Sequence, residues 1–150
     1  MTGRMLLAVA LFSLTGCGGA VRLFRGTITT ARTASSGGFT ATQTTSTTFA
    51  LASVFSGSEA NDYVFELNGN GWNATTNGVS VTFNAGQVST TTTTVTGSSG
   101  TQTVTETLSS GTGTLDQNQL TLNLTGTETS SSGASTSTST FATSFAGVRE

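Results

Sequence analysis

Apolar residues recur at every second position through most of the chain beyond residue 22. This spacing is typical of β-strands with one buried face, because successive side chains of a strand point to opposite sides. We expect each alternating set to face the interior of the domain, with Thr and Ser on the other face. The set that includes Glu106 is mixed in polarity and predicts its face less clearly. The sets are Phe49, Leu51, Ser53 and Phe55; Tyr63, Phe65 and Leu67; Val79, Val81 and Phe83; Gln102, Val104, Glu106 and Leu108; Leu120, Leu122 and Leu124; and Phe141, Thr143, Phe145 and Gly147.

Short clusters of Gly, Asn, Asp and Ser separate these runs and predict tight turns. Asn77-Gly78 is the strongest of these signals, because this pair is typical of the type I′ turn between antiparallel strands. The predicted turns lie at 35–38, 57–59, 68–71, 77–78, 84–86, 97–100, 111–113, 116–118 and 131–133.

Between the turns the sequence predicts about eight or nine short strands and no helix beyond residue 22. We expect an all-β antiparallel meander that forms a small barrel, because closure removes exposed strand edges. A two-sheet sandwich is the alternative. The predicted strands are 22–33, 39–55, 62–67, 72–76, 79–84, 87–96, 101–109, 119–129 and 135–148.

The first sixteen residues follow a different pattern. Arg4 precedes an apolar run of ten residues, Met5–Leu14. A run of this length is too short to span a bilayer, which needs about 20 residues, but it matches the helical apolar region of a secretory signal peptide. We therefore predict a cleaved signal peptide at 1–16, a tether at 17–22 and a single β domain at 23–150.

The segment Leu14-Thr15-Gly16-Cys17 resembles the lipobox of bacterial lipoproteins, and Cys17 is the only cysteine of the chain. The resemblance implies that a dedicated signal peptidase recognises Leu14, Thr15 and Gly16 and cleaves before Cys17. It also implies a diacylglycerol on the thiol of Cys17 and an acyl chain such as palmitate on the new α-amine. Several acyl chains anchor a protein firmly, whereas one holds it only marginally.

The residue after the lipidated cysteine directs sorting in that family, where Asp causes retention in the inner membrane. Gly18 stands at this position. The resemblance therefore implies a protein of the bacterial cell envelope that is anchored by lipid, with the outer membrane as its expected location.

The C-terminal part carries a second resemblance. Residues 113–127, followed by Phe145-Ala146-Gly147-Val148-Arg149, are similar to the final hairpins of small uncharacterised bacterial lipoproteins with lipocalin-like meanders. Those proteins often close with an aromatic-x-Gly-x-Arg strand. The resemblance favours a barrel over a sandwich.

The composition excludes several classes of function. Among 150 residues there are 35 Thr and 20 Ser, but no His and a single Cys. Without these residues the chain cannot build a Cys/His zinc site or a Ser-His-Asp triad. A net charge of −2 with five scattered basic residues provides no basic face for nucleic acid. We predict no metal, no non-covalent cofactor and no catalytic residue.

Three segments resemble functional motifs but predict ordinary structure. The GxGxxA match that starts at Gly69 lacks the helix that a dinucleotide site requires, so we expect a hairpin loop. The calcium-like start Asp116-Gln117-Asn118 lacks the later Gly and Glu, so we expect a turn. Glu59, Asp62 and Glu66 form the only local acidic cluster. A hydrolase based on carboxylates alone is the third candidate function, and the absence of His and Lys argues against it.

Tyr63 and Trp72 are candidates for a ligand pocket, although aromatic residues of a small β domain belong more often to the core. We therefore expect a non-enzymatic barrel that is structural or binds a small apolar ligand. The alternative is a surface or matrix component that assembles through exposed strand edges. The expected partners are the membrane, through the lipid anchor, and the enzymes that process lipoproteins.

Overall fold

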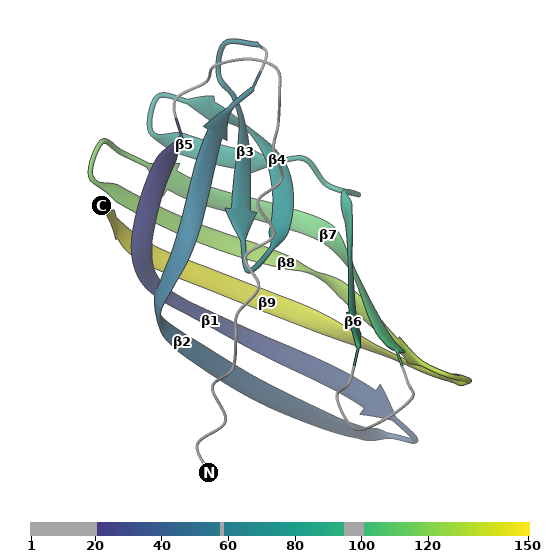
Figure 1. Cartoon of the computed structure of the whole chain (residues 1–150). Helices are drawn as coiled ribbons and strands as arrows, with labels where there is room; N and C mark the ends of the chain where they lie inside the picture. Colours follow the sequence, from purple (N-terminus) through teal and green to yellow (C-terminus); the bar gives the residue numbers. More distant parts are fainter. Residues whose placement is uncertain (1–20, 58, 95–100) are drawn as a thin grey trace.

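The computed structural model describes residues 21–57, 59–94 and 101–150, and these form an all-β domain (Figure 1). It contains nine strands, one for each strand that the sequence predicts. They are β1 (Arg22–Ser36), β2 (Phe39–Ser56), β3 (Asp62–Leu67), β4 (Asn70–Asn77), β5 (Ser80–Phe83), β6 (Val88–Thr94), β7 (Thr101–Leu115), β8 (Gln119–Ser132) and β9 (Ser135–Arg149).

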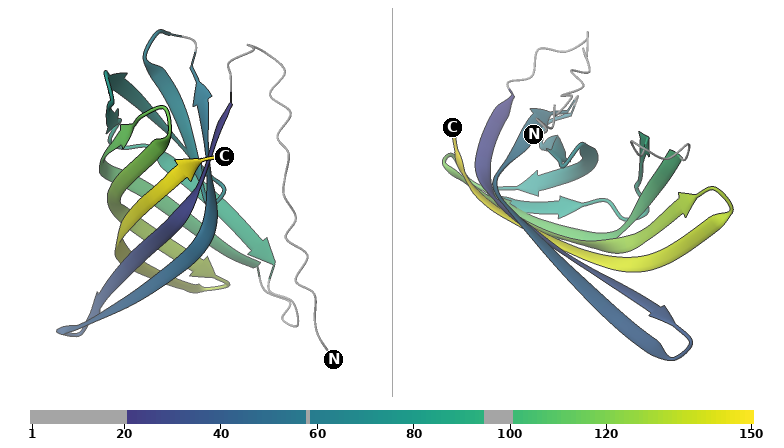
Figure 2. Two further views of the ribbon diagram at one scale, coloured as in Figure 1. Left: turned by 90° about the vertical axis from the view of Figure 1, so that its left-hand side faces the viewer. Right: turned by 60° about the horizontal axis from the view of Figure 1, so that its bottom comes forward.

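The strands form one antiparallel sheet in the order β5-β4-β3-β2-β1-β9-β8-β7-β6. The first strand pairs with the last, and β5 also pairs with β7 through the register Val81↔Gly113. This second pairing completes a ring of bonded strands (Figures 1 and 2). The predicted barrel-like meander is therefore confirmed.

The ring is closed along only part of its length. β2 pairs with β3 over Ala52–Ser56 alone, whereas its first part, Phe39–Ala50, pairs only with β1. The pairing of β1 with β9 ends at Thr33↔Thr140. Beyond that point the β1–β2 hairpin diverges from β8 and β9 (Figure 2, right). Within the described part of the chain, one side of the barrel is consequently open.

A single hydrophobic core fills the closed part of the barrel. Its largest fully buried side chains include Phe24, Phe65 and Phe145, and the rings of Phe65 and Phe83 lie 5.2 Å apart. Leu120, Leu122 and Leu124 are all buried, as their alternation predicts. The predicted inward faces of β3, β7, β8 and β9 are confirmed.

The predicted inward face of β2 is wrong. Ala50, Ala52 and Val54 are buried, whereas Phe49 is 76% exposed and Leu51 is 48% exposed. The register of β1 with β2 shifts by one residue between Gly26 and Ile28, so β2 carries a bulge next to Phe49, whose φ is +59°. Small residues face the interior here, because the large side chains of neighbouring strands already fill it.

The predicted turn at 111–113 is also wrong, since β7 continues through it to Leu115. Gly111 faces the interior, where an added Cβ would lie 2.7 Å from Leu124 Cδ2 and 2.9 Å from Phe83 Cβ. Glycine in a strand often marks such a close approach rather than a turn. The two glycines of this segment therefore allow neighbouring side chains and strands to lie close to β7.

One hairpin differs in detail from the predicted turn type. The hairpin between β4 and β5 pairs Asn77 with Ser80, so its central residues are Gly78 and Val79. Only Gly78 has a positive φ, which matches a type II′ turn and not the predicted type I′ turn. The type I′ pattern occurs instead between β3 and β4, where Asn68 and Gly69 both have positive φ.

Candidate functional site

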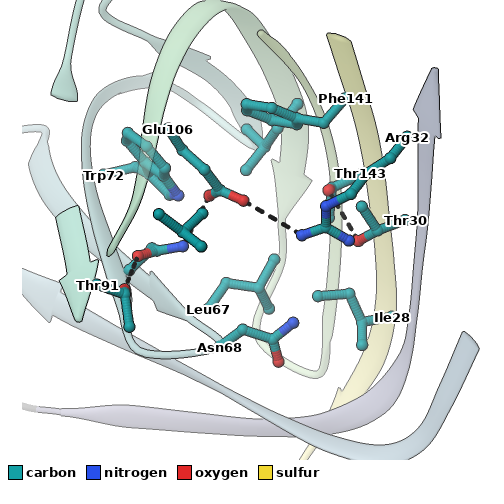
Figure 3. Close-up of a pocket in the computed structure, with 13 residues that line it drawn as sticks. Ile28, Thr30, Arg32, Leu67, Asn68, Trp72, Thr91, Glu106, Phe141 and Thr143 are labelled. Atoms are coloured by element: carbon teal, nitrogen blue, oxygen red, sulfur yellow. Dashed lines mark hydrogen bonds and ion pairs between the residues drawn. The ribbon is translucent and has the colours of Figure 1, made fainter. Parts of the chain in front are cut away.

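A cavity of about 220 Å³ lies inside the barrel on its open side, beside the turn between β3 and β4 (Figure 3). The strands that line it are β1, β4, β6, β7, β8 and β9, together with the end of β3. The cavity lies where the closed apolar core gives way to the open part of the sheet.

One wall of the cavity is apolar and belongs to the hydrophobic core. It contains Ile28, Leu67, Trp72, Leu124 and Phe141, which are all buried. Trp72 is only 2% exposed, and Figure 3 shows its ring at the cavity wall. Core packing therefore holds this wall in place before any ligand arrives.

Charged side chains line the cavity as well, next to these apolar residues. Arg32 on β1 donates from Nε to Glu128 Oε2 on β8 at 2.5 Å, and its Nη2 forms an ion pair with Glu106 Oε1 on β7 at 3.5 Å. The side chains of Glu106 and Glu128 are 13% and 12% exposed. Arg32 and Glu106 line the cavity directly.

The two glutamates are an unusual pair, because Glu106 and Glu128 are direct cross-strand partners in the register of β7 and β8. Like charges in this position destabilise a sheet. Arg32 offsets this repulsion by contacting both carboxylates. The result is a cluster of two carboxylates and one guanidinium at the edge of the cavity.

Burial raises the pKa of the Glu106 carboxyl above its ordinary value. The nearby guanidinium of Arg32 lowers this pKa and opposes the effect, whereas the charge and hydrogen bond of Glu128 add to the rise. Burial is the largest of these causes, so ionised Glu106 is costly in the cavity as it stands.

Asn70 connects the cavity to the line along which β4 and β6 lie side by side, which we call the seam between them. Its Nδ2 donates to Glu106 Oε2 at 2.7 Å, while its Oδ1 accepts from Ser89 at 2.6 Å and from Thr91 at 3.3 Å. Asn70, Thr91 and Glu106 all line the cavity. Side chains alone therefore bond β4 to β6 at this point.

Gln87 bridges the same seam in a second way. The backbone N–H of Asn73 donates to Gln87 Oε1 at 2.6 Å, and Gln87 Nε2 donates to the carbonyl oxygen of Asn73 at 2.7 Å. A side-chain amide thus takes the place of a peptide group in the ladder. It continues the β4–β5 pairing past the point where β5 ends.

The acidic cluster of Glu59, Asp62 and Glu66 does not line the cavity. Asp62 and Glu66 lie on β3, and Glu66 is exposed on the side of the strand away from the core. No group of three His, Cys, Asp or Glu residues that could hold a metal is found among the residues that the structure describes. The acids that do meet are Glu106 and Glu128, which lie 22 positions apart in the sequence.

The two aromatic candidates have different positions. Trp72 belongs to the core and also lines the cavity, whereas Tyr63 packs against the core from its edge, with the guanidinium of Arg22 5.4 Å from its ring centre. The segments at Gly69 and at Asp116 form hairpin turns as predicted.

Arg32 and Glu128 are site residues that the sequence does not predict, and Glu106 is predicted only on a mixed face. Glu106 between Val104 and Leu108 was the available signal, because a charged residue on an inward face needs a partner. The spacing of Arg32 and Glu128 carries no such signal, since only the pairing of β1, β9 and β8 brings them together.

The residues of the predicted lipidation site, Leu14, Thr15, Gly16 and Cys17, lie outside the described residues. The predicted signal peptide at 1–16 and most of the tether at 17–22 lie there too. In the portion that the structure describes, no helix is long and apolar enough to cross a membrane.

Comparisons of the chain with protein-family models, with curated proteins and with solved structures find no match. The cavity and the N-terminal motif are therefore the two features that bear on function.

Proposed function

We propose that this protein is a lipid-anchored component of the bacterial cell envelope whose barrel binds a small ligand without catalysis. The observation that carries the ligand-binding part is the cavity of about 220 Å³ beside Trp72. The lipobox resemblance at Leu14–Cys17 carries the anchor, and Gly18 favours the outer membrane.

The size and lining of the cavity support this proposal. A water molecule occupies about 30 Å³ of liquid, so the cavity has room for a small ligand only. Its apolar wall and its few converging polar groups are the usual features of a ligand site. The wall already belongs to the core, so binding requires little ordering of side chains.

A hydrolase based on carboxylates receives less support from the same residues. Glycoside hydrolysis needs one carboxyl group to act as an acid and the other as a base or nucleophile. Here Arg32 contacts both Glu106 and Glu128, and Asn70 donates to the second oxygen of Glu106. One oxygen of each carboxylate, Glu128 Oε2 and Glu106 Oε2, is thus held by a short bond to an internal partner.

The anchor is tested by expressing the full chain in a bacterial host and measuring the mass of the mature protein. We expect loss of residues 1–16 and an added diacylglycerol and acyl chain on Cys17, both absent from Cys17→Ala. A mature wild-type protein that retains residues 1–16, or carries no acyl mass, would refute the anchor.

Ligand binding is tested through Trp72, which is the only tryptophan of the chain. We expect short n-alkanols to change its fluorescence in a saturable way, with affinity rising with chain length until the cavity is full. Thr30→Phe should abolish this response because Thr30 lines the cavity, whereas Thr29→Phe on the adjacent outward position should retain it. A response that is absent from the wild type, or equal in both variants, would contradict binding in this cavity.

A second function is favoured by the free edge of β2. Among the residues that the structure describes, Phe39–Ala50 pairs only with β1, and this stretch contains no charged residue and no proline. Such edges are prone to pair with other chains. Assembly through this edge predicts oligomers of the mature protein whose population rises with concentration in sedimentation velocity.

The edge variant Thr44→Lys separates this assembly from other contacts. We expect it to abolish the oligomers, because a lysine on an edge strand opposes pairing. Thr125→Lys is the matched control, since it lies on β8, a strand that is paired on both sides. Oligomers that survive Thr44→Lys, or a monomer at every concentration, would exclude assembly through β2.

A further inference from the structure

We infer that the ligand of the cavity is a small organic amine, with its ammonium group beside Glu106 and its apolar body against Trp72. This inference rests on the proposed ligand-binding function and names the ligand class. It follows from the cavity's charge, its hydrogen-bond acceptors and its apolar wall.

The charge of the cavity wall is unbalanced. Arg32 and Glu106 are the ionisable residues among those that line the cavity, and Glu128 joins them through Arg32. Two carboxylates and one guanidinium leave a formal charge of −1 when both acids are ionised. Charges interact more strongly in a partly buried site than in water. An ammonium group supplies the positive charge that the cluster lacks.

The acceptors of the site suit an ammonium group. Arg32 makes its short contact with Glu128, whereas its Nη2 stays 3.5 Å from Glu106 Oε1. This oxygen of Glu106 therefore retains capacity for another donor. The hydroxyl oxygens of Thr30 and Thr143, which lie 2.9 Å apart, line the same cavity as further acceptors (Figure 3). A primary ammonium has three N–H donors to place among them.

The apolar wall selects the rest of the molecule. Ile28, Leu67 and Phe141 are each buried and offer no hydrogen bond from their side chains. Trp72 adds the aromatic surface that attracts cations most strongly among the side chains. A ligand with one ammonium group and a short hydrocarbon body therefore matches both the carboxylate of Glu106 and the apolar side chains of the cavity.

A carboxylate ligand matches the site less well. Its negative charge would lie beside Glu106, and Arg32 is already bonded to both glutamates. A neutral alcohol fits the apolar wall but leaves the charge of the cluster unbalanced. These differences give an order of affinity that can be measured.

The test uses three probes of equal length, hexylamine, hexanol and hexanoate, at about pH 7 with Trp72 fluorescence as the readout. We expect hexylamine to bind the full-length protein at least about tenfold more tightly than hexanol, as a hydrogen bond to a charged group allows. Hexanoate should bind most weakly. In Glu106→Gln, hexylamine and hexanol should bind about equally.

Two controls keep the outcome clear. Hexanol binding by Glu106→Gln shows that the variant still forms the cavity, and Glu66→Gln, an exposed position on β3, should keep the wild-type order. Equal binding of the three probes, or tightest binding of hexanoate, would overturn the amine inference and leave the ligand-binding proposal intact. Binding of none of the probes would overturn both.

Discussion

Glu106 makes the stability of this domain depend on pH in a way that its burial explains. Its pKa is raised from 4.5, mainly by burial, so the folded chain holds this proton to a higher pH than the unfolded chain. The folded state then binds more protons between the ordinary and the raised pKa, and stability falls as pH rises through that window. Above the raised pKa the loss is complete and constant.

Replacement of this side chain removes the pH-dependent loss. We expect the free energy of unfolding of Glu106→Gln, relative to the wild type, to increase from about pH 4 to about pH 7. Urea denaturation at the two pH values measures this double difference. The exposed Glu66→Gln should show a smaller change, and a Glu106→Gln difference that is the same at both pH values would contradict the role of burial.

The residues of β2 show how far a single position can be interpreted from sequence. Phe49, Leu51 and Phe55 alternate as a buried face would, yet Ala50, Ala52 and Val54 face the core. Both sets have a period of two, so the pattern alone does not choose between them. The smaller side chains face the interior because the large side chains of neighbouring strands leave little volume there.

Individual strands show the same ambiguity for glycine. The sequence Gly111-Thr112-Gly113 is typical of a turn, but it lies within the unbroken strand β7. Glycine signals a special backbone position without stating which kind. At Gly111 the positions of Phe83 and Leu124 show that the strand needs a residue without a side chain, because these two residues fill the space.

This packing role is tested by adding a methyl group. We expect Gly111→Ala to destabilise the domain by about 1–3 kcal/mol, because overpacking displaces its neighbours. Gly71→Ala on β4 is the matched control, since its Cβ would meet only Val64 Cγ1, at 3.7 Å. Urea denaturation compares the two. Equal effects would mean that backbone propensity, and not the contact with Phe83, sets the cost.

The seam between β4 and β6 is a second feature at the level of elements. Gln87 bonds to both backbone groups of Asn73, and Asn70 bonds to Ser89, Thr91 and Glu106. Asn70 and Thr91, which hold part of this seam, also line the cavity. The prediction of about eight or nine strands was confirmed. The contact between β4 and β6, however, depends on polar side chains of a kind that is equally common in loops.

The whole molecule combines a closed ring with an open side, and the two parts should differ in local stability. Strands with partners on both edges are expected to open rarely, whereas a free edge exposes backbone groups to solvent. The division runs through β2 itself, because Ala52–Ser56 pairs with β3 and Phe39–Thr48 does not.

Hydrogen exchange of the native protein tests this division. We expect amides of residues 40–48 to exchange faster on average than those of residues 52–56 and of residues 120–126 on β8. Both stretches belong to the same strand, and their exchange rates are compared after correction for the intrinsic rate of each sequence. Equal protection along β2 would indicate that its free edge is covered, as the assembly alternative requires.

Local chemistry accounts for the number, approximate limits and antiparallel order of the strands. Alternation with a period of two and clusters of turn residues act within a few positions, so they are visible in the chain. The lipobox resemblance and the absence of His belong to the same level. They concern anchoring and excluded chemistry without reference to the fold.

The cavity and its charges arise from contacts between distant segments. Pairing of β1 with β9 and of β9 with β8 brings Arg32 to Glu128, and the register of β7 with β8 places Glu106 opposite Glu128. A shift of one residue in any of these registers would turn the side chains to the other face. Since register depends on the closure of the whole sheet, the site could be found only once the strands were placed in space.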